Sequence, residues 1–161
     1  MIDRIRAVLP ADVALNANGD VARYALLELP VIADVNMDVG TPLAGLHAAL
    51  NWAAVSHDAV LTVPSDCPFL PADLVQRLSV AGVPAIAASG DEVHYLTGIW
   101  PVKLLPRIEG ALAQGMRRVK DWAAAAEASV VTWPAIPFDP FMNVNTPEDL
   151  AVAEGIAESI F

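Results

Sequence analysis

The most constraining feature of the sequence is a short apolar run, residues 59–63, that Pro64-Ser65-Asp66 stops abruptly. A partly β-branched run of this length is typical of a strand buried in the middle of a parallel sheet. Residues 71–74 then open a helix. Ligands of open α/β sheets bind at the carboxyl ends of the strands, and a carboxylate there suits Mg²⁺ carrying a nucleotide phosphate. Asp66 is therefore either a metal ligand or a cap of the turn, and the local sequence leaves both readings open.

Predicted strands and helices alternate along the chain. Short apolar runs predict strands at residues 12–18, 30–34, 59–63, 84–88, 92–100 and 129–133. Helical patterns predict helices at residues 2–9, 21–27, 43–55, 72–80, 102–114, 119–127 and from residue 146 onward. This alternation indicates the α/β class, with a mostly parallel sheet covered on both faces. No repeat or linker interrupts the 161 residues, so we expect a single domain spanning residues 1–161.

The ends of the predicted helices carry capping signals. We expect an N-cap at Asp20, a first-turn proline at Pro42, a C-cap at Gly115 and a capping box at Thr146-Pro147-Glu148-Asp149. Short polar side chains accept from the free N–H groups of a first turn, and glycine adopts the left-handed conformation that often ends a helix. These signals fix where the helices begin and end.

Composition excludes several classes of protein. The formal net charge is −10, and Arg117-Arg118 is the longest basic cluster, which argues against nucleic-acid binding. Although 55% of the residues are hydrophobic, no apolar run reaches the roughly 18 residues that a membrane span needs. The first six residues mix charges and cannot form a signal-peptide core. The single Cys67 excludes an internal disulfide framework and a cysteine-based zinc site. We expect a cytoplasmic protein without a membrane partner.

Polar residues stand at the ends of three of the predicted strands: Asn16 and Asn18, Asp34, and Asp66. If those strands are neighbours, these side chains converge at one edge of the sheet, beside the helix N-terminus near Gly45. Asn145 can join them, and the combination suits a purine ring and a metal-bound phosphate. Taken individually, each of these residues could instead simply end a strand or cap a turn. The three histidines, His47, His57 and His94, are scattered and are read as surface or structural residues.

Four segments together carry a family resemblance. They are Thr41-Pro42-Leu43-Ala44-Gly45, Pro64-Ser65-Asp66-Cys67-Pro68-Phe69, Gly115-Met116-Arg117-Arg118-Val119 and Asn143-Val144-Asn145-Thr146-Pro147-Glu148-Asp149-Leu150. Their order and spacing resemble the molybdenum cofactor guanylyltransferases, the MobA family, from about residue 2 to about residue 154. The resemblance implies a Rossmann-like three-layer α/β/α sandwich of the nucleotide-diphospho-sugar transferase type.

The family's chemistry implies roles for particular residues. The terminal phosphate of molybdopterin attacks the α-phosphate of GTP, which releases pyrophosphate and forms the guanine dinucleotide cofactor. By resemblance, Asp66 is the catalytic residue and the Mg²⁺ ligand. Asn16, Asp34 and Gly45 belong to the guanine-nucleotide side, whereas Arg117, Arg118, Asn143 and Asn145 face the pterin. Such a site works by positioning and by neutralising phosphate charge.

The resemblance implies GTP and molybdopterin as substrates and raises molybdoenzymes or their chaperones as further partners. Two alternatives stay open. A close enzymatic variant would use CTP, as a molybdopterin cytidylyltransferase. A non-catalytic molybdopterin-binding or adaptor protein is the other alternative.

One departure from the family concerns the start of the sequence. The family begins with a strand and a glycine-rich loop, followed by Asp-Lys, that cradle the triphosphate, whereas this sequence begins within the family's first helix. A truncated start and a degenerate protein both explain this, and the otherwise intact pattern favours truncation. We therefore expect apolar edges to be exposed, and the 161-residue chain alone to show no guanylyl transfer until that segment is restored. Tyr95-Leu96 also replaces a proline usual after His94, which argues against a pterin-side role for that histidine.

Overall fold

The computed structural model describes residues 12–35 and 40–160. The elements are, in chain order, β1 (Leu15–Asn16), η1 (Val21–Leu27), β2 (Val31–Ile32), α2 (Pro42–Ala53), β3 (Ala59–Thr62), α3 (Leu74–Val80), β4 (Ala85–Ser89), β5 (Glu92–Pro101), η2 (Val102–Leu104), α4 (Leu105–Ala113), α5 (Val119–Ala125), β6 (Ser129–Trp133) and α6 (Pro147–Ile160). The α/β class is confirmed. The helix expected at residues 2–9 lies outside the described residues.

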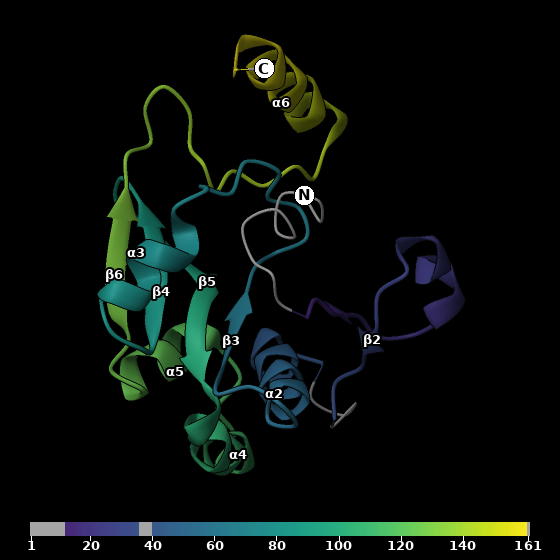
Figure 1. The fold of residues 1–161 in the computed structure, drawn as a ribbon, viewed down its shortest axis with the longest axis vertical. Helices are drawn as coiled ribbons and strands as arrows, with labels where there is room; N and C mark the ends of the chain where they lie inside the picture. The colour runs from purple at the N-terminus through teal and green to yellow at the C-terminus, as the bar shows by residue number, and fades with distance from the viewer. Residues whose placement is uncertain (1–11, 36–39, 161) are drawn as a thin grey trace.

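The strands form two sheets. The larger sheet has the order β3-β5-β4-β6, and β1 and β2 form a separate parallel pair. β4 and β6 are also parallel, but β5 runs antiparallel to both of its neighbours. The larger sheet is therefore mixed, because β5 lies between two strands that run the other way. In Figure 1 the carboxyl ends of β3 and β6 point toward the end of the sheet from which the chain continues to α6.

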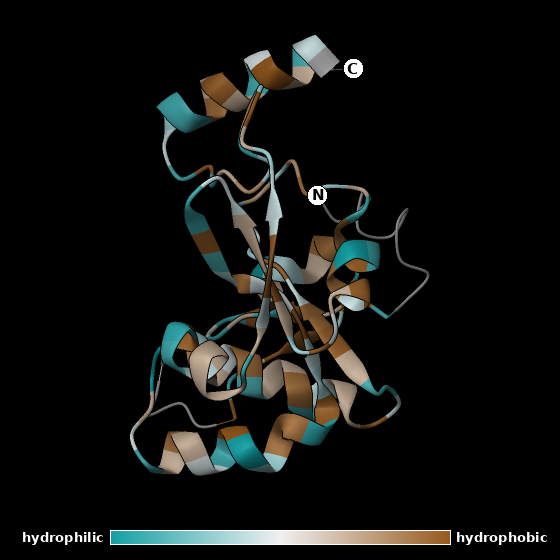
Figure 2. Ribbon diagram, turned by 90° about the vertical axis from the view of Figure 1, so that its left-hand side faces the viewer, coloured by the Kyte–Doolittle hydropathy of each residue, from teal (hydrophilic) through white to brown (hydrophobic). Residues whose placement is uncertain are grey.

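Helices cover both faces of the larger sheet, which confirms the three-layer arrangement. On one face, α2, α4 and α5 pack around a cluster that includes Leu50, Trp100 and Trp122. On the other face, α3 packs on a cluster that includes Cys67, Trp133 and Phe141. Figure 2 shows hydrophobic segments gathered where the helices meet the sheet. The segments that carry Asp66 and Asn143 contribute Cys67 and Phe141 to the second cluster, whereas Val119, next to Arg118, belongs to the first.

The position of β3 differs from the expectation. The run at residues 59–63 was expected to form a fully buried central strand, but β3 is at the edge of the four-stranded sheet in the described part of the chain. Of its four residues only Val60 is buried, whereas all five residues of β4 are buried. A short apolar run has the same appearance in an edge strand and in a central one, so periodicity alone could not separate them.

The predicted N-cap at Asp20, first-turn proline and capping box are confirmed, whereas the C-cap of α4 is Gln114 and Gly115 follows it. Asp20 accepts a hydrogen bond from the backbone N–H of Ala22 at 3.0 Å, although the helix it caps is a 3₁₀ helix. Pro42 lies in the first turn of α2. At the start of α6, Thr146 and Asp149 bond to each other's backbone N–H groups at 3.1 and 2.9 Å. Gly115, after α4, has a φ of +90°.

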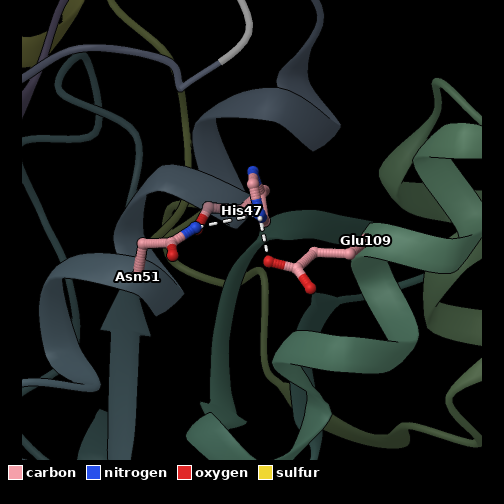
Figure 3. A network of polar contacts seen from close by, with 3 residues as sticks. All are labelled: His47, Asn51 and Glu109. Carbon is pink, nitrogen blue, oxygen red and sulfur yellow. Dashed lines mark hydrogen bonds and ion pairs between the residues drawn. The ribbon is translucent and has the colours of Figure 1, made fainter.

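A histidine joins α2 to α4 inside the first helical layer. His47 is 8% exposed, and its Nε2 lies 2.8 Å from Nδ2 of Asn51 and 3.4 Å from Oε1 of Glu109 (Figure 3). The Asn51 amide also donates to the backbone carbonyl of His47 at 3.0 Å. This arrangement agrees with the interpretation of His47 as a structural residue.

Candidate active site

The ends of β1 and β2 bring three polar side chains together. Nδ2 of Asn16 donates to Oδ1 of Asp34 at 3.2 Å, and Nδ2 of Asn18 donates to Oδ2 of Asp34 at 2.9 Å. The backbone N–H of Asp34 donates in return to Oδ1 of Asn18 at 2.9 Å. Asp34 itself is only 7% exposed. The expected convergence is therefore present for these three residues, with a carboxylate at its centre. It does not extend to Asp66: β1 and β2 form a sheet separate from that of β3, and no hydrogen bond of the described residues links this group to Asp66.

Gly45, in the first turns of α2, lies directly against this group. A Cβ at Gly45 would lie 2.6 Å from Oδ1 of Asn16 and 3.8 Å from Oδ1 of Asp34. The first distance is shorter than real Cβ contacts, so a side chain at this position would force the Asn16 amide to shift. Asn16, Asp34 and Gly45 thus form one cluster, as expected from the sequence.

The turn after β3 places Asp66 beside the segment that leads to α6. Asp66 is partly exposed, and its backbone carbonyl accepts a hydrogen bond from the N–H of Val144 at 2.9 Å. Asn143 and Asn145 flank Val144, and both are exposed. The structure therefore brings Asp66 and the two asparagines to the same end of the larger sheet.

The buried Cys67 makes a second link between these two segments. Its thiol donates toward Oδ1 of Asn143 at 3.0 Å and toward the carbonyl of Phe141 at 3.4 Å. Burial, with smaller contributions from the Asp66 and Asp139 carboxylates, raises the pKa of Cys67 to about 12. The thiol therefore stays protonated at neutral pH and acts as a hydrogen-bond donor rather than a nucleophile.

Phe141 is held from the other side by aromatic neighbours. Its ring centroid lies 4.8 Å from that of His94 and 5.4 Å from that of Trp133. Nε2 of His94 lies 2.6 Å from the hydroxyl of Ser89, at the carboxyl end of β4. Sequence reasoning missed these supports. The position of Cys67 next to Asp66 was a signal for one of them, but nothing in the sequence indicated that His94 contacts Phe141.

Arg117 and Arg118 are not part of either cluster. They lie in the connection between α4 and α5, and both are exposed. Arg117 donates to the carbonyls of Leu112 and Met116, and Arg118 pairs with Asp121 at 2.8 Å. Within the described residues, no hydrogen bond links either arginine to Asp66, Asn143 or Asn145.

The donor set allows only a limited kind of metal site. Among the described residues, no three His, Cys, Asp or Glu side chains are grouped so that they could hold a metal ion. Mg²⁺ is commonly bound through one or two carboxylates, with waters and substrate phosphates completing the octahedron. The partly exposed Asp66 suits this mode of binding. The described residues do not provide a closed site in which protein side chains alone surround the ion. In the described part of the chain, no helix is long and apolar enough to cross a membrane.

Solved structures share this architecture. One is molybdopterin-guanine dinucleotide biosynthesis protein A from Archaeoglobus fulgidus, with a TM-score of 0.68 and 22% identity over 99% of this chain and 86% of that one. Another is 2-C-methyl-D-erythritol 4-phosphate cytidylyltransferase from Thermus thermophilus, with a TM-score of 0.63 and 16% identity over 98% of this chain and 88% of that one. At these identities the likeness shows the fold alone, an α/β fold that this chain shares with both proteins.

Sequence comparison identifies the family to which the chain belongs. The family described as MobA-like NTP transferase domain matches residues 1–129, and this chain belongs to that family. A protein from Rhodopseudomonas palustris (strain BisB5) is 48% identical over 89% of this chain and 73% of its own length. A protein from Rhodobacter capsulatus is 43% identical over 96% of this chain and 80% of its own length. Both are named molybdenum cofactor guanylyltransferase. The resemblance to the MobA family is confirmed.

Proposed function

We propose that this protein is a molybdenum cofactor guanylyltransferase, which transfers GMP from GTP to molybdopterin. The observation that carries the proposal is the pair of clusters at the carboxyl ends of the strands. One cluster holds Asp34 between two asparagine amides, and the other joins Asp66 to Asn143 through Cys67. The names of the relatives support the same reaction. A cytoplasmic location is part of this proposal.

The Asp34 carboxylate is the proposed contact for the base. A carboxylate accepts at about four lone-pair positions, and each oxygen of Asp34 uses one for an asparagine amide. The remaining positions suit two donors side by side. Guanine presents such a pair, the N1–H and the N2 amino group, whereas cytosine presents a single amino donor next to acceptors. This arrangement favours GTP over CTP.

Asp66 is the proposed ligand for Mg²⁺. The ion would supply positive charge that stabilises the phosphate oxygens during transfer. Asp66 holds its place because its carbonyl accepts from Val144 N–H at 2.9 Å and because the preceding β3 fixes the start of the turn. Its partly exposed side chain would reach the ion, and the buried Cys67 beside it would anchor the turn.

The pterin side is proposed to consist of Asn143, Asn145, Arg117 and Arg118. The two asparagines lie next to the Asp66 turn, so an acceptor on molybdopterin would meet them beside the metal. The two arginines are proposed from the resemblance. Arg118 would have to exchange its bond with Asp121 for one with the substrate.

Binding and turnover can be tested separately. Calorimetry with GTP, CTP and molybdopterin, each with Mg²⁺, measures affinity, and pyrophosphate release measures transfer. We expect GTP to bind more tightly than CTP. Asp34→Ala or Asn16→Ala should weaken the binding of GTP more than the binding of molybdopterin. Because this chain alone is expected to show no guanylyl transfer, transfer is measured in a protein that carries the family's glycine-rich N-terminal segment; there Asp66→Asn should abolish transfer and leave the thermal unfolding transition in place.

Three results would overturn the proposal. Equal binding of GTP and CTP would remove the argument for guanine. Near-normal transfer by Asp66→Asn would reassign Asp66 to capping the turn. Molybdopterin binding without any binding of a nucleotide would favour the non-catalytic adaptor.

A further inference from the structure

Asn18 makes a two-point contact with Asp34. Its amide Nδ2 donates to Oδ2 of the Asp34 carboxylate at 2.9 Å, and its Oδ1 accepts from the Asp34 backbone N–H at 2.9 Å. One side chain therefore fixes both the backbone and the side chain of the buried acid. Asn16 makes a single contact with Asp34, from Nδ2 to Oδ1 at 3.2 Å, and its second N–H donates to the carbonyl of Ile32 at 3.1 Å.

This contact matters because the strands beneath it are short. β1 and β2 pair only through Leu15 with Val31 and Asn16 with Ile32. Their ladder hydrogen bonds end at Ala17 N–H to the carbonyl of Ile32, two residues before Asp34. Two-residue strands supply little ordering of the residues after them. The Asn18 side chain continues the connection between the two chain segments up to the acid itself.

Among the described residues, Asn18 makes two of the three hydrogen bonds that side chains form with Asp34, and Asn16 makes the third. Gly45 approaches from α2 but carries no side chain, and its nearest atoms are those of Asn16. Asn18 is exposed, whereas Asp34 is buried. An exposed side chain that donates to a buried carboxylate and accepts from its backbone fixes the direction in which the carboxylate's free lone pairs point.

We propose that Asn18 is a positioning residue for guanine recognition, which orients the Asp34 carboxylate toward the N1–H and N2 amino donors of the base. The inference rests on the proposed function, since it takes Asp34 as the base contact. Asn18 does not itself touch the base. Its loss lets the carboxylate rotate, and the preference for a base with two adjacent donors falls. The overall fold keeps its two hydrophobic clusters, neither of which includes Asn18.

The experiment compares GTP with ITP, because hypoxanthine keeps the N1–H and lacks the N2 amino group. Dissociation constants are measured by calorimetry for the wild type, Asn18→Ala and Asn18→Asp. We expect the wild type to favour GTP over ITP by about tenfold, the effect of one hydrogen bond to a charged acceptor. In both variants this ratio should fall toward one, while molybdopterin binds as in the wild type. Asn18→Asp keeps an oxygen for the Asp34 N–H but replaces the donor by a second carboxylate, so loss of the donor and charge repulsion act together in that variant.

Asp20→Ala is the matched control. It removes the N-cap of η1, two residues along the same loop, without removing a contact to Asp34. A general loosening of the loop would weaken GTP and ITP equally in Asp20→Ala and in the Asn18 variants, with an unchanged ratio. That result would overturn the role of Asn18 and leave guanylyl transfer standing. A wild type with no preference for GTP over ITP or CTP would overturn the proposed function, and this inference with it.

Discussion

The Cys67 thiol lies 3.0 Å from Oδ1 of Asn143 and donates to it. Because burial raises the pKa of Cys67 to about 12, this donor is present across the physiological pH range. The bond takes up the acceptor of the Asn143 amide and leaves its NH₂ group directed away from Cys67. The exposed Asn143 is therefore oriented to donate to a phosphate or carbonyl oxygen.

Replacing Cys67 by valine should weaken molybdopterin binding and leave GTP binding unchanged. Valine fills a similar volume but cannot donate, so the Asn143 amide loses its fixed orientation. One neutral hydrogen bond contributes about 1 kcal/mol, which corresponds to an increase of about fivefold in the dissociation constant for molybdopterin. Calorimetry with each substrate measures both effects.

Cys67→Ser is the control for this prediction, because a hydroxyl keeps the donor. We expect it to restore most of the affinity that valine loses. An equal loss in both variants would mean that Cys67 acts through packing against Phe141 and Trp133 rather than through its bond to Asn143.

Gly45→Ala should disturb the nucleotide cluster. The added Cβ would lie 2.6 Å from Oδ1 of Asn16, so the Asn16 side chain must move away from Asp34. Overpacking of this kind costs about 1–3 kcal/mol, and we expect GTP affinity to fall about tenfold. Gly110→Ala in α4 is the matched control, because no atom lies within 4 Å of its Cβ position. That variant should be stabilised by about 0.5–1 kcal/mol and bind GTP normally. Unchanged GTP binding in Gly45→Ala would show that Gly45 is not part of the nucleotide-binding site.

The stability that the buried His47 contributes should depend on Asn51, in the same helix, more than on Glu109 in α4. A ring nitrogen that accepts from Asn51 cannot donate to Glu109 at the same time, and the Asn51 contact is shorter, 2.8 Å against 3.4 Å. The Glu109 side chain is also 53% exposed. We expect Asn51→Ala to lower the free energy of unfolding by about 1 kcal/mol, and Glu109→Gln by less than about 0.5 kcal/mol. Urea denaturation measures both. If Glu109→Gln lowered the free energy of unfolding more than Asn51→Ala does, Glu109 would form an ion pair with His47.

The cap of α6 should weaken in acid. Hydrogen bonds from the backbone of Asn145, and then from Thr146, lower the pKa of Asp149 below its ordinary value of 3.8. Since the folded pKa is the lower one, the cap stabilises the folded state fully above pH 3.8 and is lost as pH falls through the folded value. Hydrogen exchange at the Asn145 and Thr146 amides should therefore be faster in Asp149→Ala than in the wild type at pH 7. This difference should disappear in strong acid.

Glu148→Ala controls for helix charge in this experiment, because it removes an acid from the same first turn and keeps the bonds of Asp149. In Glu148→Ala, the rate of hydrogen exchange at the Asn145 amide should equal that of the wild type. Faster exchange in Glu148→Ala, equal to that of Asp149→Ala, would mean that the charge near the helix end matters and the specific bonds do not.

Much of the fold is encoded in local sequence. β6 has the predicted bounds, and the caps at Asp20 and Asp149 form as their residue types indicate. The antiparallel course of β5 was also encoded, because Ser89-Gly90-Asp91 is too short a connection for two parallel strands. Periodicity could not reveal that β3 is an edge strand. It also could not reveal the register shift after Ile86 that pairs Ala87 with His94.

The two halves of the site differ in how far the sequence predicts them. Asn16, Asn18 and Asp34 meet because short neighbouring strands end together, and such ends are visible as polar residues after apolar runs. The bond between Cys67 and Asn143 joins residues 76 positions apart and depends on how an irregular segment packs against Phe141. No local pattern encodes that packing. The roles proposed for Arg117 and Arg118 stay predictions.

The same difference in spacing sets an order of assembly on the ribosome. The partners in the Asn16–Asp34 bond are 18 residues apart, so this half can close soon after α2 has been synthesised. The Asp66 turn acquires its support only when Val144 has emerged, close to the last helix. Because short loops close more readily than long ones, we expect the nucleotide half to form before the pterin half as the chain emerges. A nascent chain stalled before Phe141 would thus carry the Asn16–Asp34 contact but not the anchor of Asp66.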